Sequence, residues 1–517
     1  MRKLHPFHGG MRLEGHKHES LQRGLRQASL PERLYLPLKQ HIGEFNKPLV
    51  EVGNRVLKGD MIAANASPIC ASVHASSSGI VSDIGEYPVA HPSGQKDVCI
   101  VIDVDGEDEA ATAVKHDLDS LDADAMLELI CRAGIVGLGG AVFPTTAKLS
   151  RGRAHGIETL IINGVECEPY ITCDDMLMRH YAAEVIRGVG YLQRILNPQT
   201  TLIGIEDNKP EAIASMRTAL DATAGVDADI VSIPTIYPSG GEKQLIQILT
   251  GREVPHGQLA FDIGLFCQNV GTCVAISRAL EQDQPLISRV VSVSGDNIRE
   301  PSNWEVRLGT PVQHLVELSG GLIDAGKSRL VMGGPMMGFA LSGGEVPVVK
   351  ATNNILVMRE PAITTQPGYH DECIRCSKCT EVCPASLLPQ QLYWHARARN
   401  WDRTEEFHLF DCIECGCCSA VCPSSIPLVQ YYRAAKSEIR AAQKAQVKSD
   451  RARIRFEARE RRLLLKKQQD EERRRKKREA LQKKRAPAGD AAAEADPVQA
   501  ALERVKARKQ AIREEAE

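Results

Sequence analysis

The spacing of apolar residues changes along the chain, and each change predicts a different kind of structure. Residues 31–105 contain short apolar runs separated by turn residues, a pattern typical of β-strands. Residues 125–285 alternate apolar strand-like runs, such as 160–164 and 201–205, with helical runs such as 181–194. This alternation predicts βαβ units around a mostly parallel sheet, so we expect an α/β and α+β protein of several domains.

The pattern changes twice more toward the C-terminus. Residues 286–350 begin with a strand-like run and continue with a helix expected over 311–319. From residue 431 the composition narrows to Ala, Glu, Lys, Arg and Gln, which predicts a charged helical tail, partly disordered, over 431–517. We expect a break in this helix at 486–490. The chain contains no run of about eighteen apolar residues and no signal peptide, so we expect no membrane-spanning helix.

Length and charge limit the interpretation only loosely. A chain of 517 residues is long enough for roughly three or four domains. The formal net charge of −2 conceals a basic tail, with Arg473–Arg478 as its extreme. We expect no nucleic-acid binding, because no aromatic platform or recognition fold accompanies these charges. Attraction to an anionic membrane surface, worth on the order of 1 kcal/mol per basic residue, fits better, and a flexible tail without a fixed role is the alternative.

The most specific signal is a cysteine pattern that occurs twice. The chain reads Cys373-x-x-Cys376-x-x-Cys379-x-x-x-Cys383-Pro384, and the same spacing returns as Cys412-x-x-Cys415-x-x-Cys418-x-x-x-Cys422-Pro423. This is the spacing that binds two [4Fe–4S] clusters, with the fourth cysteine of each run ligating the other cluster. We therefore predict one cluster on Cys373, Cys376, Cys379 and Cys422, and a second on Cys412, Cys415, Cys418 and Cys383. Cys417 is off the spacing and is expected to be unliganded.

Two other interpretations of these cysteines are weaker. Zinc sites use C-x-x-C pairs but do not need a third and a fourth cysteine before a proline. A disulfide framework would be expected in a short secreted protein. The remaining cysteines show no framework spacing, and free thiols together with clusters indicate a reducing, cytosolic environment.

A glycine-rich segment over 134–149 predicts an anion site. Gly137, Gly139 and Gly140 would let backbone N–H groups approach a phosphate, and a helix is expected to open just after them. A plain strand–helix turn is the alternative. An apolar strand then ends in Asn163, Glu166 and Glu168, at the position where α/β sheets place ligand contacts.

The order of motifs GxGGxxFP, NxxExEP, YxxGGE and QNVGT resembles the flavoprotein subunit of respiratory NADH dehydrogenase, a family that binds FMN and NADH in a Rossmann-like domain. The resemblance implies that Gly137, Gly139, Gly140 and Lys148 cradle the FMN phosphate and ribityl chain. Asn163 and Asn269 would contact flavin, with Thr272 near the phosphate. Glu166 and Glu168 would shape the nicotinamide side, and Tyr237, Gly240 and Glu242 would line the pocket. No side chain is assigned as catalytic.

This chain departs from the family pattern at several positions. Val165 replaces an acidic residue, a Glu-Glu pair is reduced to Gly241-Glu242, and an Asn-Asn pair is reduced to Gln268-Asn269. These changes affect the carboxylates more than the glycines, so they weaken the expectation of NADH more than that of FMN. The alternative role for Glu166 and Glu168 is to cap neighbouring backbone at the strand end.

The whole domain order resembles the C subunit of the Rnf (RsxC-like) electron-transport complex. Residues 31–105 resemble a barrel-sandwich hybrid without an attachment lysine at its tip, and 286–350 resemble a soluble-ligand-binding β-grasp (SLBB) module. The expected order is an N-terminal segment 1–30, the hybrid 31–105, the FMN/NADH domain 125–285, the β-grasp module 286–350, a two-cluster ferredoxin domain 363–430 and the tail 431–517.

That resemblance implies a function. The chain would be a peripheral subunit, on the cytoplasmic side of the inner membrane, of an ion-translocating oxidoreductase (a translocase). It would pass electrons between NADH, by way of FMN, and partner subunits through two [4Fe–4S] clusters. The expected partners are the other Rnf-type membrane subunits, ferredoxin-like electron carriers and NAD(H). A soluble NADH-dependent flavin/iron–sulfur dehydrogenase subunit and a non-enzymatic electron-wire adaptor are the alternatives.

Overall fold

A computed structural model describes residues 2–67, 69–324, 326, 328–359, 370–485 and 496–514. The chain forms two compact units, Met1–Ser437 and Glu438–Glu517. The start of the expected ferredoxin domain (363–369) and the expected helix break (486–490) lie outside the described residues.

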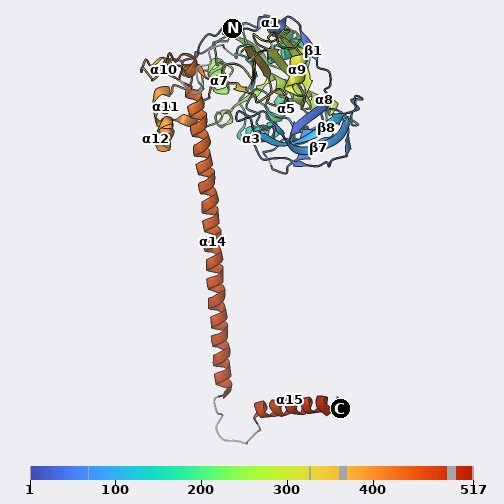
Figure 1. The fold of residues 1–517 in the computed structure, drawn as a ribbon, viewed down its shortest axis with the longest axis vertical. Coiled ribbons are helices and arrows are strands. Elements are labelled where there is room, and N and C mark those ends of the chain that lie inside the picture. The colour runs from blue at the N-terminus through green and yellow to red at the C-terminus, as the bar shows by residue number, and fades with distance from the viewer. Residues whose placement is uncertain are drawn as a thin grey trace. The chain divides into compact units, whose positions relative to one another are not determined.

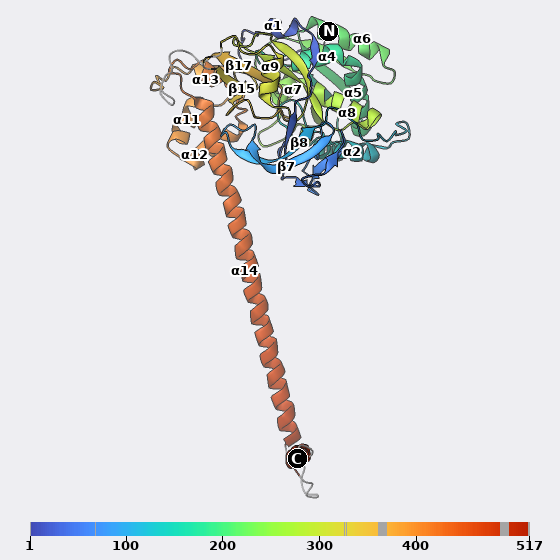
Figure 2. The same ribbon diagram turned by 45° about the vertical axis from the view of Figure 1, so that its right-hand side comes forward.

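A double-sheet sandwich contains most of residues 31–105. One antiparallel sheet has the order β2(Arg33–Pro37)-β8(Lys96–Val104)-β7(Gly79–Pro88)-β4(Arg55–Val56), and the other β3(Lys47–Pro48)-β5(Met61–Ala64)-β6(Val73–His74). Figures 1 and 2 show β7 and β8 as the long blue strands of this sandwich. At the hairpin after β6, Ser76, Ser77 and Ser78 are fully buried, so this tip offers no exposed attachment point.

A four-stranded parallel sheet forms the centre of the first unit, as the alternating pattern predicts. Its order is β11(Asp229–Ile233)-β10(Thr200–Glu206)-β9(Thr159–Gly164)-β12(Leu265–Asn269). Apolar residues of β9, β10 and β12 are buried on both faces, as expected of a parallel sheet covered by helices. The helices are α2(Ala123–Arg132), α3(Thr145–His155), α4(Cys173–His180), α5(Ala182–Leu196), α6(Pro210–Ala222), α7(Glu242–Thr250) and α8(Val270–Gln282).

A six-stranded mixed sheet follows the parallel one in the chain. Its order is β1(Leu25–Gln27)-β14(Ser302–Arg307)-β13(Ser288–Ser294)-β17(Asn354–Arg359)-β15(Ser328–Met332)-β16(Phe339–Ala340), with α9(Val312–Leu318) after β14. Strand β1 pairs in parallel with β14, and α1(His18–Leu21) precedes it. No strand is expected in the N-terminal segment 1–30, so sequence reasoning misses this edge strand. A three-residue strand is too short to show a period in sequence.

Short helices surround the cysteine motifs: α10(Lys378–Glu381), α11(Pro389–Arg397), α12(Trp401–Glu406), the 3₁₀ turn η2(Leu409–Asp411) and α13(Cys417–Ala420). Figures 1 and 2 both show α11 and α12 beside the start of α14(Leu428–Arg485). The first turns of α14 bury Leu428, Val429 and Tyr432. This helix thus begins inside the first unit, a few residues before the expected start of the tail.

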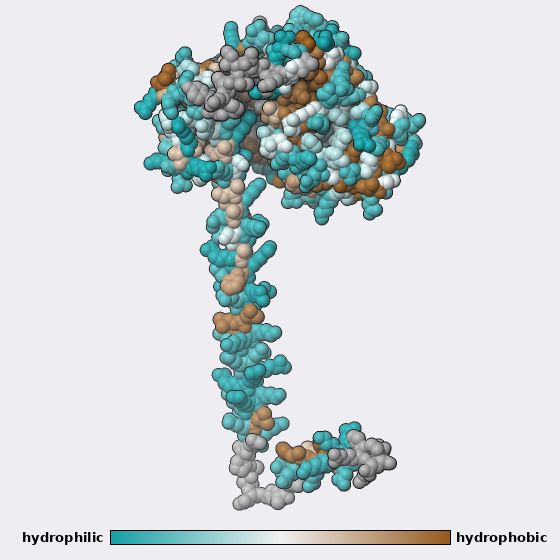
Figure 3. Space-filling view, viewed as in Figure 1, coloured by the Kyte–Doolittle hydropathy of each residue, from teal (hydrophilic) through white to brown (hydrophobic). Residues whose placement is uncertain are grey.

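The second unit consists of the rest of α14 and of α15(Pro497–Glu514). Figure 3 shows hydrophilic side chains along α14, interrupted by separate apolar ones. The described residues include no helix that is both long and apolar enough to cross a membrane.

Candidate flavin and iron–sulfur sites

A cavity of about 660 Å³ opens at the carboxyl ends of β9 and β12. Its volume lies within the range of roughly 300–1,000 Å³ that is usual for cofactor sites. It is lined by all the residues predicted to bind FMN or NADH except Thr272, namely Gly137, Gly139, Gly140, Lys148, Asn163, Glu166, Glu168, Tyr237, Gly240, Glu242 and Asn269.

The glycine loop over 137–144 presents unused donors at this cavity. Within the part of the chain that the structure describes, the backbone N–H groups of Gly139, Gly140 and Ala141 donate to no protein atom. The hydroxyl of Thr145, at the start of α3, is buried and also unpartnered. The N–H groups of Gly139, Gly140 and Ala141 lie on exposed residues, whereas the Thr145 hydroxyl is buried, where an unpartnered donor is costly. Together these donors fit an anionic ligand held at a helix N-terminus.

Two glycines of the cavity wall are required by geometry. Gly140 has a φ of +106° and open space where a side chain would point, so any side chain there would be strained and would enter the cavity. A Cβ on Gly240 would lie 2.9 Å from the carbonyl oxygen of Val165, too close for any other residue.

Thr272 supports the glycine loop from beneath and does not line the cavity. It is fully buried, and its hydroxyl accepts a 3.0 Å hydrogen bond from the backbone N–H of Leu138. Thr272, predicted to lie near the phosphate, is therefore one layer behind the surface of the cavity. It positions the loop that carries the free donors.

Lys148 lies on the same side of the cavity. Its Nζ donates to Glu242 at 2.8 Å and to the carbonyl of Cys267 at 2.6 Å. Burial opposes the charge of this lysine, but attraction by Glu242 outweighs burial and raises its pKa. Lys148 is therefore cationic at neutral pH, as a phosphate-binding residue must be.

The two asparagines at the strand ends shape the cavity floor. Asn163 and Asn269 are register partners on β9 and β12. Asn163 donates to the carbonyl of Gly240 at 2.9 Å. Asn269 caps α8 by accepting from the N–H of Gly271 at 2.8 Å, and it donates to Asp174 at 2.7 Å.

Glu166 is engaged by the backbone at the start of α4. Its carboxylate accepts from the N–H groups of Asp174, at 2.8 Å, and Asp175, at 3.4 Å. Burial, with the nearby Asp174 carboxylate, raises the pKa of Glu166 from 4.5 to about 7. This geometry matches the capping alternative for Glu166, although the residue also faces the cavity.

Glu168 has a comparable role toward the loop after β15. Its carboxylate accepts from the N–H groups of Met336, at 2.8 Å, and Met337, at 3.0 Å. Gly334 makes room for it, since a Cβ there would lie 2.2 Å from Cγ of Glu168. Burial raises the pKa of Glu168. The carboxylate thus joins the flavin-type domain to the β-grasp module.

Sequence reasoning missed Lys17, which supports the same strand end from the N-terminal segment. Its Nζ donates to the carbonyl oxygens of Glu166 at 2.7 Å, Glu168 at 3.0 Å and Ile171 at 2.5 Å. Burial lowers its pKa. A single lysine in a non-periodic segment carries no signal that could have identified this contact.

Two further cavities separate the motif cysteines into two sets. One is lined by Cys373, Cys376, Cys379 and Cys422, and the other by Cys383, Cys412, Cys415 and Cys418. Each set combines three cysteines of one motif with the last cysteine of the other, so the donor chemistry fits two cubanes. Cys417 is fully buried and lines neither cavity. The ligand assignment stays a prediction.

The flavin-type cavity and the second cysteine cavity share a wall. Ile413 lines both of them. Tyr237, which is 2% exposed, donates from its hydroxyl to the carbonyl oxygen of Cys415 at 2.6 Å. The pocket side chain expected from the YxxGGE motif therefore reaches the cysteine loop directly.

Comparisons with known proteins match these parts of the chain. Family models match as the RnfC barrel sandwich hybrid domain (5–107), the Nuo51 FMN-binding domain (130–278), the SLBB domain (290–340) and the 4Fe-4S dicluster domain (372–426). The air-oxidized and H₂-reduced structures of NAD⁺-reducing [NiFe]-hydrogenase align with TM-scores of 0.42 and 0.44, at 19% and 16% identity. They cover 57% and 66% of this chain, and 60% and 72% of the hydrogenase chains. These scores are too low to support an inference.

Curated relatives extend over nearly the full chain. The C subunit of the ion-translocating oxidoreductase complex of Pectobacterium atrosepticum is 48% identical over 98% of this chain and 71% of its own length. The corresponding C subunits of Pectobacterium carotovorum and of Vibrio cholerae (Classical Ogawa) are 47% and 48% identical over 98% of this chain, and it spans 66% and 65% of their lengths. The chain thus spans about two thirds of the length of these relatives, and it belongs to the family of C subunits of ion-translocating oxidoreductase complexes.

Proposed function

We propose that this chain passes electrons between NADH and partner subunits of an ion-translocating complex, through FMN and two [4Fe–4S] clusters. The chain carries an FMN-binding domain and a 4Fe–4S dicluster domain. The single observation that carries the proposal is the wall shared by the flavin-type cavity and the cavity of Cys383, Cys412, Cys415 and Cys418. Electron transfer between two cofactors requires that they lie close together, and the shared wall brings their sites together.

The chain's own residues supply binding and orientation. The free N–H groups of the glycine loop and the cationic Lys148 would hold the phosphate of FMN, while the asparagines at the strand ends fix the cavity floor. When bound, FMN converts between two-electron and one-electron transfer. The buried Tyr237 and the half-buried Ile413 would keep the flavin-type cavity and the adjoining cysteine cavity in fixed proximity.

The shared wall also suggests an order for the two clusters. The set Cys383, Cys412, Cys415 and Cys418 adjoins the flavin-type cavity through Ile413. The set Cys373, Cys376, Cys379 and Cys422 has no lining residue in common with that cavity. We infer that the set Cys383, Cys412, Cys415 and Cys418 forms the inner site. The other set would form the outer site, facing partner subunits.

NADH binding would involve the nicotinamide side of the cavity. The two carboxylates expected on the nicotinamide side both accept backbone N–H groups, although both still line the cavity. Anaerobic titration of the purified full chain with NADH tests this part. We expect loss of oxidised-flavin absorbance followed by the paramagnetic signals of reduced clusters. Bound flavin that NADH does not reduce would refute the NADH assignment, and a chain without flavin would favour the electron-wire adaptor.

We also propose that the chain is peripheral to the membrane, on the cytoplasmic side, with the other members of the complex as partners. The basic side chains along α14, including Arg473–Arg478, support attraction to an anionic surface. Membrane fractionation distinguishes this from a soluble dehydrogenase. We expect the chain in the membrane fraction and its release by high salt, because salt screens exposed charges. Its recovery in the soluble fraction at low salt, with the complex partners present, would refute the peripheral assignment.

A further inference from the structure

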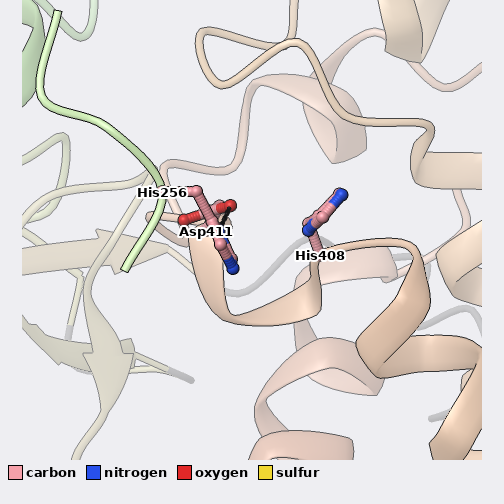
Figure 4. Close-up of side chains that lie close together, drawn as sticks. All are labelled: His256, His408 and Asp411. Carbon is pink, nitrogen blue, oxygen red and sulfur yellow. Dashed lines mark hydrogen bonds and ion pairs between the residues drawn. The ribbon is translucent and has the colours of Figure 1, made fainter. Parts of the chain in front are cut away.

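Two histidines and one aspartate meet where the flavin-type domain contacts the cysteine domain, outside the three cavities. His256 lies in the loop between α7 and the 3₁₀ turn η1(Ala260–Ile263), while His408 and Asp411 lie at the two ends of η2. Figure 4 shows His256 and Asp411 joined by a hydrogen bond, with His408 on the same turn as Asp411. The rings of His256 and His408 have centroids 4.8 Å apart, at an interplanar angle of 67°.

We propose that His256, His408 and Asp411 bind a divalent transition-metal ion, with Zn²⁺ as the best match. One potential ligand atom from each residue lies within 4.8 Å of the others. Two imidazoles and a carboxylate are ligands that Zn²⁺ takes readily, and three protein ligands leave one position for water. This site requires none of the motif cysteines.

The site needs only a small adjustment to close on an ion. Ligand atoms around a tetrahedral Zn²⁺, at about 2.0–2.1 Å from the metal, lie roughly 3.3 Å from one another. The ligand atoms of the three residues now lie up to 4.8 Å apart, and rotation of the side chains can shorten these distances to the value around a bound ion. The side chain of His256 is 61% exposed, so few packing contacts oppose its movement once it exchanges Asp411 for a metal, whereas the side chain of Asp411 is 24% exposed and more firmly placed.

A simple ion pair accounts for only part of this arrangement. Pairing between His256 and Asp411 explains two of the three residues, but not the second imidazole beside them. The backbone of His408 has a φ of 58°, which residues other than glycine seldom adopt. Its carbonyl accepts a hydrogen bond from the N–H of Asp411 at 2.9 Å. This turn therefore holds His408 and Asp411 on the same side of η2.

An ion at this position would connect two domains next to an expected cluster ligand. Asp411 directly precedes Cys412, and His256 is more than 150 residues away in the chain. The metal would hold the segment before Cys412 against the flavin-type domain. Binding to the folded state alone would also stabilise that contact by mass action.

Zinc binding to the full, cluster-loaded chain under anaerobic conditions tests the proposal. After dialysis we expect one retained Zn²⁺ per chain by elemental analysis. X-ray absorption at the zinc edge should show nitrogen and oxygen neighbours at about 2.0–2.1 Å, without the sulfur shell at about 2.3 Å that zinc on motif cysteines would give. His256→Gln and His408→Gln should each weaken binding by at least the roughly 10–100-fold that loss of an outer-shell partner costs.

His155→Gln is the matched control, because the Nε2 atom of His155 also lies near a carboxylate, 3.6 Å from Asp262, but no described histidine completes a metal-binding group there. This variant should bind Zn²⁺ like the unaltered chain. Zn²⁺ should also slow hydrogen exchange in segments 251–259 and 403–411 of the unaltered chain but not of His408→Gln. Failure to retain Zn²⁺, a sulfur shell at the metal, or equal binding by all variants would overturn the proposal.

Discussion

Replacing Tyr237 with phenylalanine tests the contact between the flavin-type cavity and the cysteine loop. The substitution removes one oxygen atom and keeps the ring, which packs against Cys415 and Cys417. Burial raises the pKa of Tyr237 above its ordinary value, so its hydroxyl stays protonated and donates to the Cys415 carbonyl. The variant therefore removes the hydrogen bond to Cys415, together with the interaction of the same hydroxyl with Glu168.

The expected cost follows from the burial of this bond. The donor residue is 2% exposed and the two atoms are 2.6 Å apart, so water cannot easily replace the hydroxyl. A buried acceptor left without its donor costs about 1–3 kcal/mol. If the loop over 412–420 opens locally by breaking this bond, its opening equilibrium should rise by roughly 5–150-fold, since about 1.4 kcal/mol corresponds to a factor of ten.

Hydrogen exchange read out by mass spectrometry measures this opening in the cofactor-loaded chain. We expect faster exchange in peptides over 412–420 and little change in the parallel sheet. Tyr191→Phe is the control, because its hydroxyl donates to Glu281 at 3.0 Å within the flavin-type domain and does not contact the cysteine loop. Unchanged exchange over 412–420 in Tyr237→Phe, or an equal increase in the control, would refute the reasoning.

Three further substitutions test other parts of the site. Gly140→Val should lose bound flavin while the fold persists. Gly225→Val should keep flavin, because Gly225 also has a positive φ (+79°) beside open space but lies outside the glycine loop. Equal flavin content of the two variants by absorbance would contradict the loop assignment. Cys383→Ser should lose about four irons per chain and Cys417→Ser none; the reverse iron contents would disprove the ligand sets. The pKa of Glu166 is raised by folding from 4.5 to about 7, so the stability that it contributes is complete below about pH 4.5 and is lost as the pH rises through about 7. Thermal unfolding should therefore show a smaller decline in stability over this range for Glu166→Gln than for the unaltered chain, and identical declines would exclude Glu166 as the cause.

The parts of the fold that repeat a pattern could be predicted from sequence. Helical and strand periods identified the parallel sheet, and the ends of its strands identified the cavity, because parallel strands place their carboxyl ends at one edge. Short elements were harder to predict. Strand β1 has three residues and takes its place from pairing with β14, nearly 280 residues later, so no local signal specifies it.

The candidate site was predicted by motif, but the partners of its residues were not. The YxxGGE motif placed Tyr237 in the pocket wall, while its hydroxyl partner lies 178 residues away. The NxxExEP motif placed two glutamates at the cavity, but sequence could not show that backbone N–H groups of α4 and of the loop after β15 occupy them. Hydrogen bonds between distant segments depend on the packed structure, which local patterns do not encode.

Buried lysines explain why the domains distinguished by composition form one compact unit up to Ser437. Lys17, from the N-terminal segment, donates to three carbonyls of the flavin-type domain. Lys350, the last residue of the β-grasp module, is 1% exposed and donates at 2.7 Å to the carbonyls of Ser72 in the sandwich and Gly134 in the flavin-type domain. Burying an ammonium group is unfavourable unless such acceptors surround it, and burial lowers the pKa of Lys350 to about 7. Each lysine therefore donates across a boundary between segments, and separation of the domains would break these hydrogen bonds, which opposes independent motion around the cofactor sites.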